Sequence, residues 1–352
     1  VPLENNVFGA VFGNGYNSDS HRAYLYVVNI ADGSLIAKID TGVGAAGTPN
    51  GLGPALVSDW PDGDFIAHYV YAGDLLGNLW RFDLSSAAVA DWTTSALSMF
   101  NAVDPSGDPQ PITVQPRVAT NPKRPGELML LFGTGSFFRV DDKDSADPQV
   151  QTLYGIRDSG AAVVASLGDR GNLLQQEILF EDTVVALGSP RIVRETSNNE
   201  YPPGGTEKGW YLDLVSPGGV AQGERVISRA TFPSSSRRER VRFSTLQFDA
   251  DPCSAGRQGF IFDLDLTDGS EFDRSVFDIN SDGFFNTGDL VGDRRISAIG
   301  GGFGEELTII RDRECSSDFF YDGGGNRIGG GTSGEGLATG DPVGRQSWQQ
   351  LR

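Results

Sequence analysis

The chain has 352 residues, of which 47 are glycine and 18 are proline. Together these are about 18% of the chain, which is above the average of about 12% but below the quarter or more that marks disorder, so we expect a folded, turn-rich protein. The length is too great for one compact helical or α/β core and suits one β-propeller or barrel. With 28 basic and 47 acidic residues the formal charge is −19, which disfavours nucleic acid and anionic membrane surfaces as partners.

The predicted strands are short runs of aromatic and β-branched residues separated by turn residues. The first two, at 23–30 and 35–39, are joined by an Asp-Gly turn that is typical of a hairpin. Further strands are expected at 69–74, 77–84, 128–135, 137–140, 151–156, 209–214, 224–228, 240–246 and 259–266. Residues 87–99 are the best short candidate for a helix, and the sequence has no long helical period.

Several of these units share one pattern, in which Gly, an aromatic and an apolar residue precede Asp-Leu and a turn. The pattern is found at 78–84, 209–214 and 259–264. Loose repeats of about 40–50 residues, each with four short strands, are typical of propeller blades. The sequence therefore predicts an all-β fold, a modified β-propeller, with an all-β sandwich as the alternative. Because residues 7–13 already read as part of such a unit, we expect a closed propeller to need strands from upstream residues.

The strongest local motif spans residues 278–289 and reads D-x-N-x-D-G-x-x-N-x-x-D. This is the pattern of a twelve-residue calcium loop, with side-chain oxygens at positions 1, 3, 5 and 12 and a glycine where the chain turns sharply. Asn286 is expected to act through a water molecule. The alternative is a solvated turn rich in Asp and Asn, and no clear helix flanks the loop. The predicted Ca²⁺ ligands are Asp278, Asn280, Asp282, the carbonyl of Phe284 and Asp289.

Cys253 and Cys315 are the two cysteines of the chain. Such a pair is either two buried thiols or one disulfide. Both residues lie in polar, loop-like settings, which favours a Cys253–Cys315 disulfide and an exported location. No Cys/His spacing indicates a zinc site.

The sequence shows no clear motif of a catalytic site. It has no G-x-S-x-G and no Walker A motif, and His21 and His68 have no evident nucleophile or acid beside them, so both are expected to be surface or packing residues. The acidic run at 59–64 has an irregular spacing and is interpreted as a polar turn. No stretch approaches the ~18 apolar residues of a membrane helix. We therefore predict no catalytic residues, no organic cofactor and no membrane insertion.

Motifs spread in order along nearly the whole chain carry a family resemblance. They lie at 12–18, 69–84, 132–136, 151–157, 208–213, 251–256 and 344–351. Together they are similar to the C-terminal domain of the PilY/PilC family, large calcium-dependent proteins of type IV pilus biogenesis and tip adhesion. The resemblance implies a propeller related in shape to quinoprotein dehydrogenases and used for binding rather than turnover.

The resemblance also implies a setting and partners. Residues 1–352 are expected to be the C-terminal propeller region of a longer exported protein, with the calcium loop at 278–289 and a Gly-rich segment at 323–352. The implied partners are minor pilins at the pilus tip and a host or surface receptor bound through a missing N-terminal region. The implied location is extracellular, at the pilus tip or outer cell surface.

In the family, a short calcium loop precedes the strand that matches 69–74. Here residues 60–68 take that place, and only Asp62 and Asp64 fall at ligand positions.

These observations predict a non-enzymatic, calcium-binding pilus-tip adhesin or pilus biogenesis factor. One alternative is a generic calcium-stabilised extracellular propeller without a pilus connection. The other is a quinoprotein-like dehydrogenase, but such enzymes usually have an adjacent cysteine pair and tryptophan-rich blade repeats, and this sequence has neither.

Overall fold

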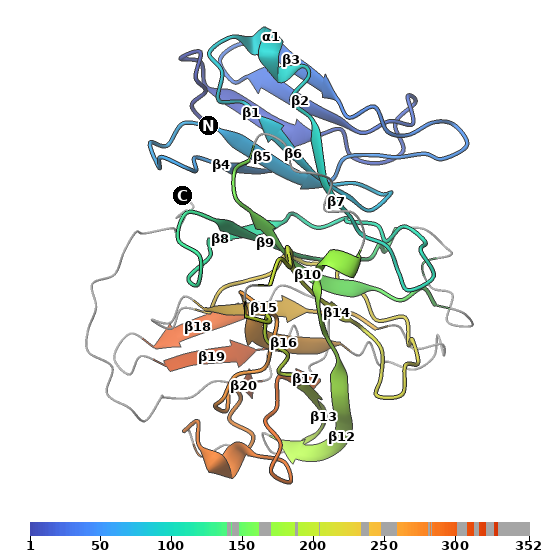
Figure 1. Cartoon of the computed structure of the whole chain (residues 1–352), viewed down its shortest axis with the longest axis vertical. Coiled ribbons are helices and arrows are strands. Elements are labelled where there is room, and N and C mark those ends of the chain that lie inside the picture. The colour runs from blue at the N-terminus through green and yellow to red at the C-terminus, as the bar shows by residue number, and fades with distance from the viewer. Residues whose placement is uncertain are drawn as a thin grey trace.

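The computed structural model shows a chain of strands joined by loops and very short helices (Figure 1). In the last three strands only the backbone is described. The described residues are 1–138, 142, 148–161, 170–186, 189–203, 205–233, 239–247, 259–280, 282, 284–300, 308–312, 317–321 and 327–329.

Two sheets at the blue end of the chain form one end of the molecule (Figure 1). The first has the order β1-β2-β3, with β1 at Gly9–Gly13, β2 at Tyr24–Asn29 and β3 at Leu35–Asp40. The second has the order β4-β5-β6-β7, with β4 at Leu56–Ser58, β5 at Tyr69–Gly73, β6 at Asn78–Asp83 and β7 at Leu97–Asn101. Helix α1, at Val89–Trp92, lies in the connection between β6 and β7.

Three further sheets follow along the long axis of the molecule (Figure 1). The third sheet contains β11 (Leu174–Gln176), β14 (Gly209–Asp213), β10 (Thr152–Asp158), β9 (Leu128–Gly133) and β8 (Arg117–Thr120), in that order. The fourth contains β12 (Ile178–Ala186), β13 (Ser189–Thr196), β17 (Ala298–Gly300), β16 (Phe260–Asp265) and β15 (Arg240–Ser244). The fifth contains β18 (Thr308–Asp312), β19 (Ser317–Tyr321) and β20 (Arg327–Gly329). Among the described strands, only β11 and β14 pair in parallel.

This architecture confirms the predicted all-β class. The strands form several small sheets, mostly from neighbours in sequence, as propeller blades do, rather than the two facing sheets of a sandwich. Most predicted strands are present within one or two residues of the expected bounds. The candidate helix at 87–99 is reduced to α1, and its second half leads into β7.

The strand predicted at 224–228 is wrong, because no regular strand forms there. Arg225 makes only an isolated bridge with Leu246. Glu224 is buried, and its carboxylate accepts hydrogen bonds from Arg194 Nη1 at 2.6 Å and Thr245 Oγ1 at 2.5 Å. These contacts with Arg194 and Thr245 hold residues 224–228 in an irregular conformation. The β-branched residues of this segment alone do not indicate it.

The recurring glycine before an aromatic residue has a steric cause. Gly209 begins β14 at φ +150°, and a Cβ there would lie 2.1 Å from the carbonyl oxygen of Gly155. A Cβ on Gly259, just before β16, would lie 2.1 Å from the carbonyl oxygen of Thr245. Neighbouring backbone therefore passes too close for any side chain, and only glycine fits these positions.

Three clusters of buried apolar residues form the core. The largest includes every residue of β9 except its terminal glycine, and it contains the fully buried Trp210 and Phe243, whose rings meet edge to face. A second cluster lies under the first two sheets. The third packs β12, β13, β16 and β17 against residues 272–279 and Ile296, so it supports the loop that begins at Asp278.

Asp74 organises the turn between β5 and β6. Its carboxylate is fully buried and accepts hydrogen bonds from the backbone N–H groups of Leu76 and Asn78, both at 2.9 Å. It also accepts hydrogen bonds from the side chains of Asn50 and Trp80, at 2.9 and 2.8 Å. One carboxylate therefore satisfies donors from a turn, a strand and a preceding loop.

Replacing Asp74 by asparagine is expected to lower the free energy of unfolding by about 1–3 kcal/mol. The amide nitrogen of asparagine cannot accept a hydrogen bond, so at least one buried donor loses its partner, and that loss costs about 1–3 kcal/mol. Urea denaturation of the full chain measures the change. The exposed Asp108→Asn is the control, with an expected effect within about 0.5 kcal/mol, and equal effects of the two substitutions would contradict this role.

Candidate metal centre

The predicted calcium loop lies in the connection between β16 and β17, in the orange segment at the end of the molecule opposite the first two sheets (Figure 1). Its first residue, Asp278, stands between Phe277 and Ile279, which are buried in the third core cluster. Because these apolar neighbours are held by packing, the start of the loop has a fixed place on the fourth sheet.

The last residue of the motif closes the loop. Asp289 ends the short 3-10 helix η3 (Thr287–Asp289), and its Oδ1 accepts a hydrogen bond from the N–H of Ile279 at 2.8 Å. Its Oδ2 accepts a second from the N–H of Asn286 at 2.8 Å, while the Asn286 side chain accepts one from the N–H of Gly288. Asn286 and Asp289 thus form a reciprocal capping box, and the bond from Ile279 brings position 12 of the motif back to position 2.

The other predicted ligands join the same network. Asp278 Oδ1 and Asn280 Oδ1 accept from the N–H of Asp282 at 3.1 and 3.0 Å. Asp282 Oδ2 accepts from the side-chain amides of Asn280 and Asn286 at 3.0 and 3.3 Å. Phe284 joins through its N–H, which donates to Asp282 Oδ1 at 2.8 Å, whereas the role predicted for its carbonyl stays a prediction.

The carboxylates of the loop differ in environment. Asp278 and Asp289 are each 1% exposed, whereas Asp282 is exposed. Burial raises the pKa of Asp289, although the N–H groups of Asn286, Asn280 and Ile279 oppose the rise. The N–H of Phe284 lowers the pKa of Asp282. The loop therefore presents both buried and exposed carboxylate oxygens.

These side chains fit a calcium ion chemically. Three aspartates and two asparagines supply hard oxygen donors, the kind that Ca²⁺ takes in sets of six to eight. The structure brings Asp278, Asn280, Asp282 and Asp289 into one hydrogen-bonded loop. Gly283 lies outside the described residues.

Several sequence predictions concern residues that the structure does not describe. Cys253 and Cys315 both lie outside the described residues, so the disulfide stays a prediction. Of the Gly-rich segment at 323–352, only β20 is described.

The acidic run at 59–64 forms the loop between β4 and β5. The Gly63 N–H donates to the Asp59 carbonyl oxygen at 2.9 Å, which agrees with the predicted polar turn. His68, at the end of this loop, is 5% exposed, and its Nε2 lies 3.0 Å from Glu4 Oε1. Sequence reasoning missed this partner because Glu4 is 64 residues away in the chain and belongs to no motif.

Comparison with known proteins decides the family. Residues 2–189 match the family model described as the PilY1 beta-propeller domain, which is more than half of the chain. The chain belongs to the PilY1 family. This membership confirms the predicted resemblance and, together with the strands described above, the predicted β-propeller fold.

Curated PilY1 relatives match over most of the chain. A type IV pilus biogenesis factor PilY1 homolog of Xylella fastidiosa (strain Temecula1) is 36% identical over 285 residues, which are 76% of this chain. The type IV pilus biogenesis factor PilY1 of Pseudomonas aeruginosa (strain PAO1) is 32% identical over 308 residues, or 80% of this chain. The alignments cover only 18% and 26% of these relatives, so the chain corresponds to a small part of each.

A solved PilY1 structure has the same fold. The crystal structure of the Pseudomonas aeruginosa PilY1 C-terminal domain aligns with a TM-score of 0.77 and 27% identity. The match covers 94% of this chain and 71% of that chain. The curated PilY1 relatives are named type IV pilus biogenesis factors, in agreement with the predicted non-enzymatic class.

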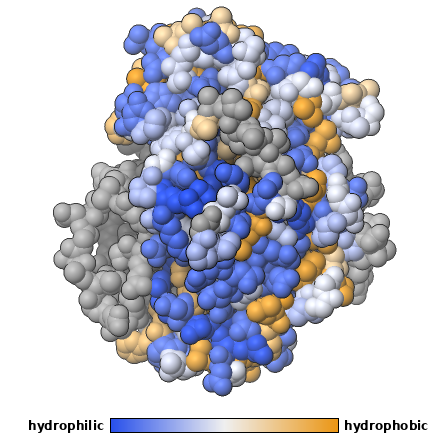
Figure 2. Space-filling model, in the orientation of Figure 1, coloured by the Kyte–Doolittle hydropathy of each residue, from blue (hydrophilic) through white to orange (hydrophobic). Residues whose placement is uncertain are grey.

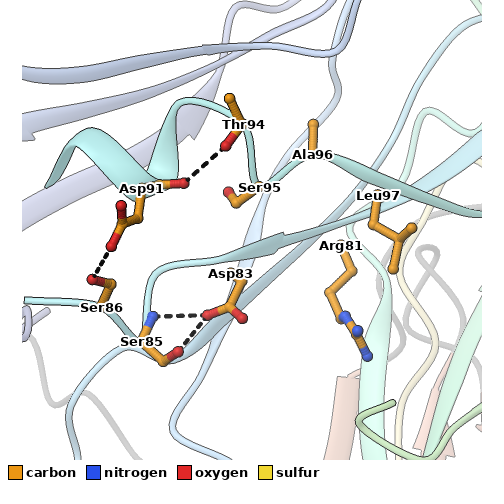
Figure 3. Close-up of a pocket in the computed structure, with 9 residues that line it drawn as sticks. All are labelled: Arg81, Asp83, Ser85, Ser86, Asp91, Thr94, Ser95, Ala96 and Leu97. Carbon is orange, nitrogen blue, oxygen red and sulfur yellow. Dashed lines mark hydrogen bonds between the residues drawn. The ribbon is translucent and has the colours of Figure 1, made fainter. Parts of the chain in front are cut away.

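A surface pocket of about 340 Å³ lies between β6, α1 and β7 (Figure 3). Its polar side chains bind each other: Ser86 Oγ donates to Asp91 Oδ2 at 2.7 Å, and Ser85 Oγ donates to Asp83 Oδ1 at 2.5 Å. Arg81 donates to the buried Asp158 at 2.7 Å. The nine lining residues include no His or Cys, so the pocket offers no nucleophile–base pair of those types.

The face drawn in Figure 2 is mostly hydrophilic, with apolar residues in scattered groups. This agrees with the formal charge of −19 for the PilY1-family chain. In the described part of the chain, no helix has the length and apolarity that a membrane span requires.

Proposed function

We propose that this chain is a calcium-binding β-propeller module of a type IV pilus biogenesis factor and acts as a rigid scaffold at the pilus tip on the outer cell surface. The observation that supports calcium binding most directly is the closed loop at 278–289, whose buried Asp278 and Asp289 carboxylates lie at its two ends. The family membership supports the connection with pili.

The ion would be held by Asp278, Asn280, Asp282, the Phe284 carbonyl and Asp289, with Asn286 acting through water. Burial disfavours the ionised form of a carboxylate, and the positive charge of calcium would stabilise that form. The formal charge of −19 raises the local concentration of cations around the protein. Calcium would therefore stiffen the end of the molecule that carries η3.

The scaffold role follows from how the polar groups of the core are used. Buried Arg194 donates to buried Glu224, and buried Arg242 pairs with buried Asp263. These charges bind each other inside the fold, which is typical of structural ion pairs.

The proposed partners are minor pilins beneath the module and a host or surface receptor that is bound through regions outside this chain. Sheet edges and the loops of a propeller offer surfaces for strand addition by other subunits. A Cys253–Cys315 disulfide would suit an exported location, and in the entropy model it would stabilise the fold by about 4 kcal/mol.

Deleting the encoding gene is expected to reduce surface pili or attachment and to leave pilin synthesis unchanged. Electron microscopy counts the pili, an adhesion assay measures attachment, and immunoblotting measures pilin. Complementation with the full-length gene should restore both properties. Unchanged piliation together with unchanged attachment would overturn the pilus role, and turnover of alcohols with a quinone by the purified protein would overturn the non-enzymatic role.

A further inference from the structure

The hairpin of β12 and β13 lies at one edge of the fourth sheet (Figure 1). Strand β12 has nine residues and is the first strand in the order of that sheet, so β13 pairs with one of its two sides. In the described part of the chain, residues 178–186 make no backbone–backbone hydrogen bond outside this pairing. The other side of β12 is therefore an open sheet edge among the described residues.

The backbone of β12 shows which residues face this edge. The N–H of Thr183 donates to the Asp182 carboxylate at 2.7 Å, so it turns away from β13. From 180 to 186 the register with β13 is continuous. Because the backbone groups of successive residues in a strand point alternately to its two sides, those of Glu181 and Val185 turn outward with those of Thr183. These three residues offer donors and acceptors to a further strand.

The edge lacks the residues that usually protect one. Natural sheet edges are commonly protected by lysine, proline or a covering segment. Strand β12 contains no lysine, arginine or proline, whereas β3, at the edge of the first sheet, carries the exposed Lys38. Val185 is 73% exposed and Leu179 is 52% exposed. A long, partly apolar edge of this kind favours pairing with another strand.

The charge of the edge indicates the kind of strand that it favours. Glu181 and Asp182 are the charged residues of β12, and both are acidic. Glu181 is bound by Arg194 of β13 at 2.7 Å, whereas Asp182 is exposed and forms no ion pair within the described part of the chain. Opposite charges on facing strands attract and like charges repel, so a strand with Lys or Arg is favoured beside β12. The formal charge of −19 acts in the same direction.

The rest of the hairpin is held firmly in place. Phe180 and Val184 of β12 pack against the third core cluster, and β13 pairs with β17. Arg194 is 1% exposed, and its guanidinium carbon lies 3.4 Å from the centre of the Phe260 ring. An added strand would therefore meet an edge that is already ordered, which lowers the entropy cost of binding.

We propose that the outer edge of β12 binds an extended, basic segment of a partner polypeptide by strand addition. Backbone hydrogen bonds to Glu181, Thr183 and Val185 would supply affinity, and the exposed Asp182 would select Lys or Arg. A second copy of this chain is disfavoured as the occupant, because two β12 strands would bring their acidic residues together. Strand addition here rests on the proposed role of the chain as a binding module.

Fluorescence anisotropy with the labelled peptide KVKVKVK tests the edge on the full chain. The wild type is expected to bind the peptide, and Val185→Pro should weaken binding at least tenfold. Proline removes an outward N–H and is tolerated on an edge strand whose N–H faces solvent. The matched control is Val185→Thr, which keeps the N–H and a β-branched side chain and should leave the affinity within about twofold. Both variants keep the charge of the chain, so non-specific attraction of the basic peptide is the same in each.

A charge reversal tests the preference for a basic strand. Asp182→Lys should weaken binding of KVKVKVK and strengthen binding of the acidic peptide EVEVEVE, because the exposed charge at the edge changes sign. Hydrogen exchange of the wild type should slow at the Glu181, Thr183 and Val185 amides when KVKVKVK is bound.

Absence of KVKVKVK binding by the wild type, or equal affinity in the wild type and Val185→Pro, would overturn the proposal. A wild-type dimer that Val185→Pro separates in analytical ultracentrifugation would also overturn it, because a second copy would then occupy the edge. Circular dichroism checks each fold, and if Val185→Pro does not fold, Asp182→Lys decides. Gene deletion tests the pilus role by a separate readout, so failure of peptide binding and failure of the proposed function are distinguishable.

Discussion

Replacing Asp263 by alanine is expected to lower the free energy of unfolding by about 3–5 kcal/mol, because removing one partner of a buried ion pair leaves a buried charge uncompensated. Asp263 is fully buried on β16 and accepts hydrogen bonds from Arg240 Nε at 2.8 Å and from Arg242 Nη2. Arg242 is itself 1% exposed, so water cannot replace the lost carboxylate. Urea denaturation of the full chain measures the loss.

The pH dependence provides a second readout for the same residue. Burial raises the pKa of Asp263, but the guanidinium groups of Arg240 and Arg242 outweigh burial, and the net pKa is below its usual value. A carboxyl whose pKa is lowered by folding stabilises the protein above its unfolded pKa, near 3.9, and that contribution is lost as the pH falls through the folded pKa. The difference in stability between wild type and Asp263→Ala should therefore shrink below about pH 4.

The matched control is Asp182→Ala in the same sheet. Asp182 lies on β12 and is exposed, and among the described residues it accepts only a local hydrogen bond from Thr183, so its loss should change stability by about 0.5 kcal/mol or less. If Asp263→Ala does not fold, Asp263→Asn keeps the shape of the side chain and removes its charge. Asp263 variants as stable as Asp182→Ala would disprove the role of this ion pair.

Local patterns predicted much of the fold, because most strands here carry their own signal. The strands at Tyr24–Asn29 and Leu35–Asp40 alternate in burial and are joined by an Asp-Gly turn, which a short window of sequence contains. The hairpin of β12 and β13 was not predicted. Charged residues such as Glu181, Asp182 and Arg194 interrupt its apolar residues, and β13 includes a proline, so no clear local pattern indicates the hairpin, which is extended by pairing with β17.

The loop at 278–289 and the contact between His68 and Glu4 differ in the same way. The loop at 278–289 was predicted because all of its predicted ligand side chains lie within twelve residues and follow a fixed spacing. The contact between His68 and Glu4 forms only when the segment before β1 packs on the loop before β5. No spacing in the sequence indicates that contact, so only the folded chain reveals it.

Adding calcium to the metal-free full chain is expected to stabilise it by about 2.7 kcal/mol when the free ion is at 100 times its dissociation constant. In Asp282→Ala this gain should largely disappear. Asp282 is the informative position because its carboxylate is exposed. Among the described residues it bonds only to Asn280, Asn286 and Phe284 within the loop, so we expect its loss to cost little without calcium. Asp289→Asn is also expected to weaken calcium binding. It is less informative, because the buried carboxylate of Asp289 closes the loop in the metal-free chain as well.

Thermal unfolding followed by circular dichroism, with and without added CaCl₂, measures both effects. The exposed Asp293→Asn, four residues beyond the loop, is the control and should keep the full calcium response. A wild-type melting temperature that does not rise with calcium would remove the basis for a calcium site at 278–289. A rise that persists in Asp282→Ala and in Asp289→Asn would place the ion elsewhere in the chain.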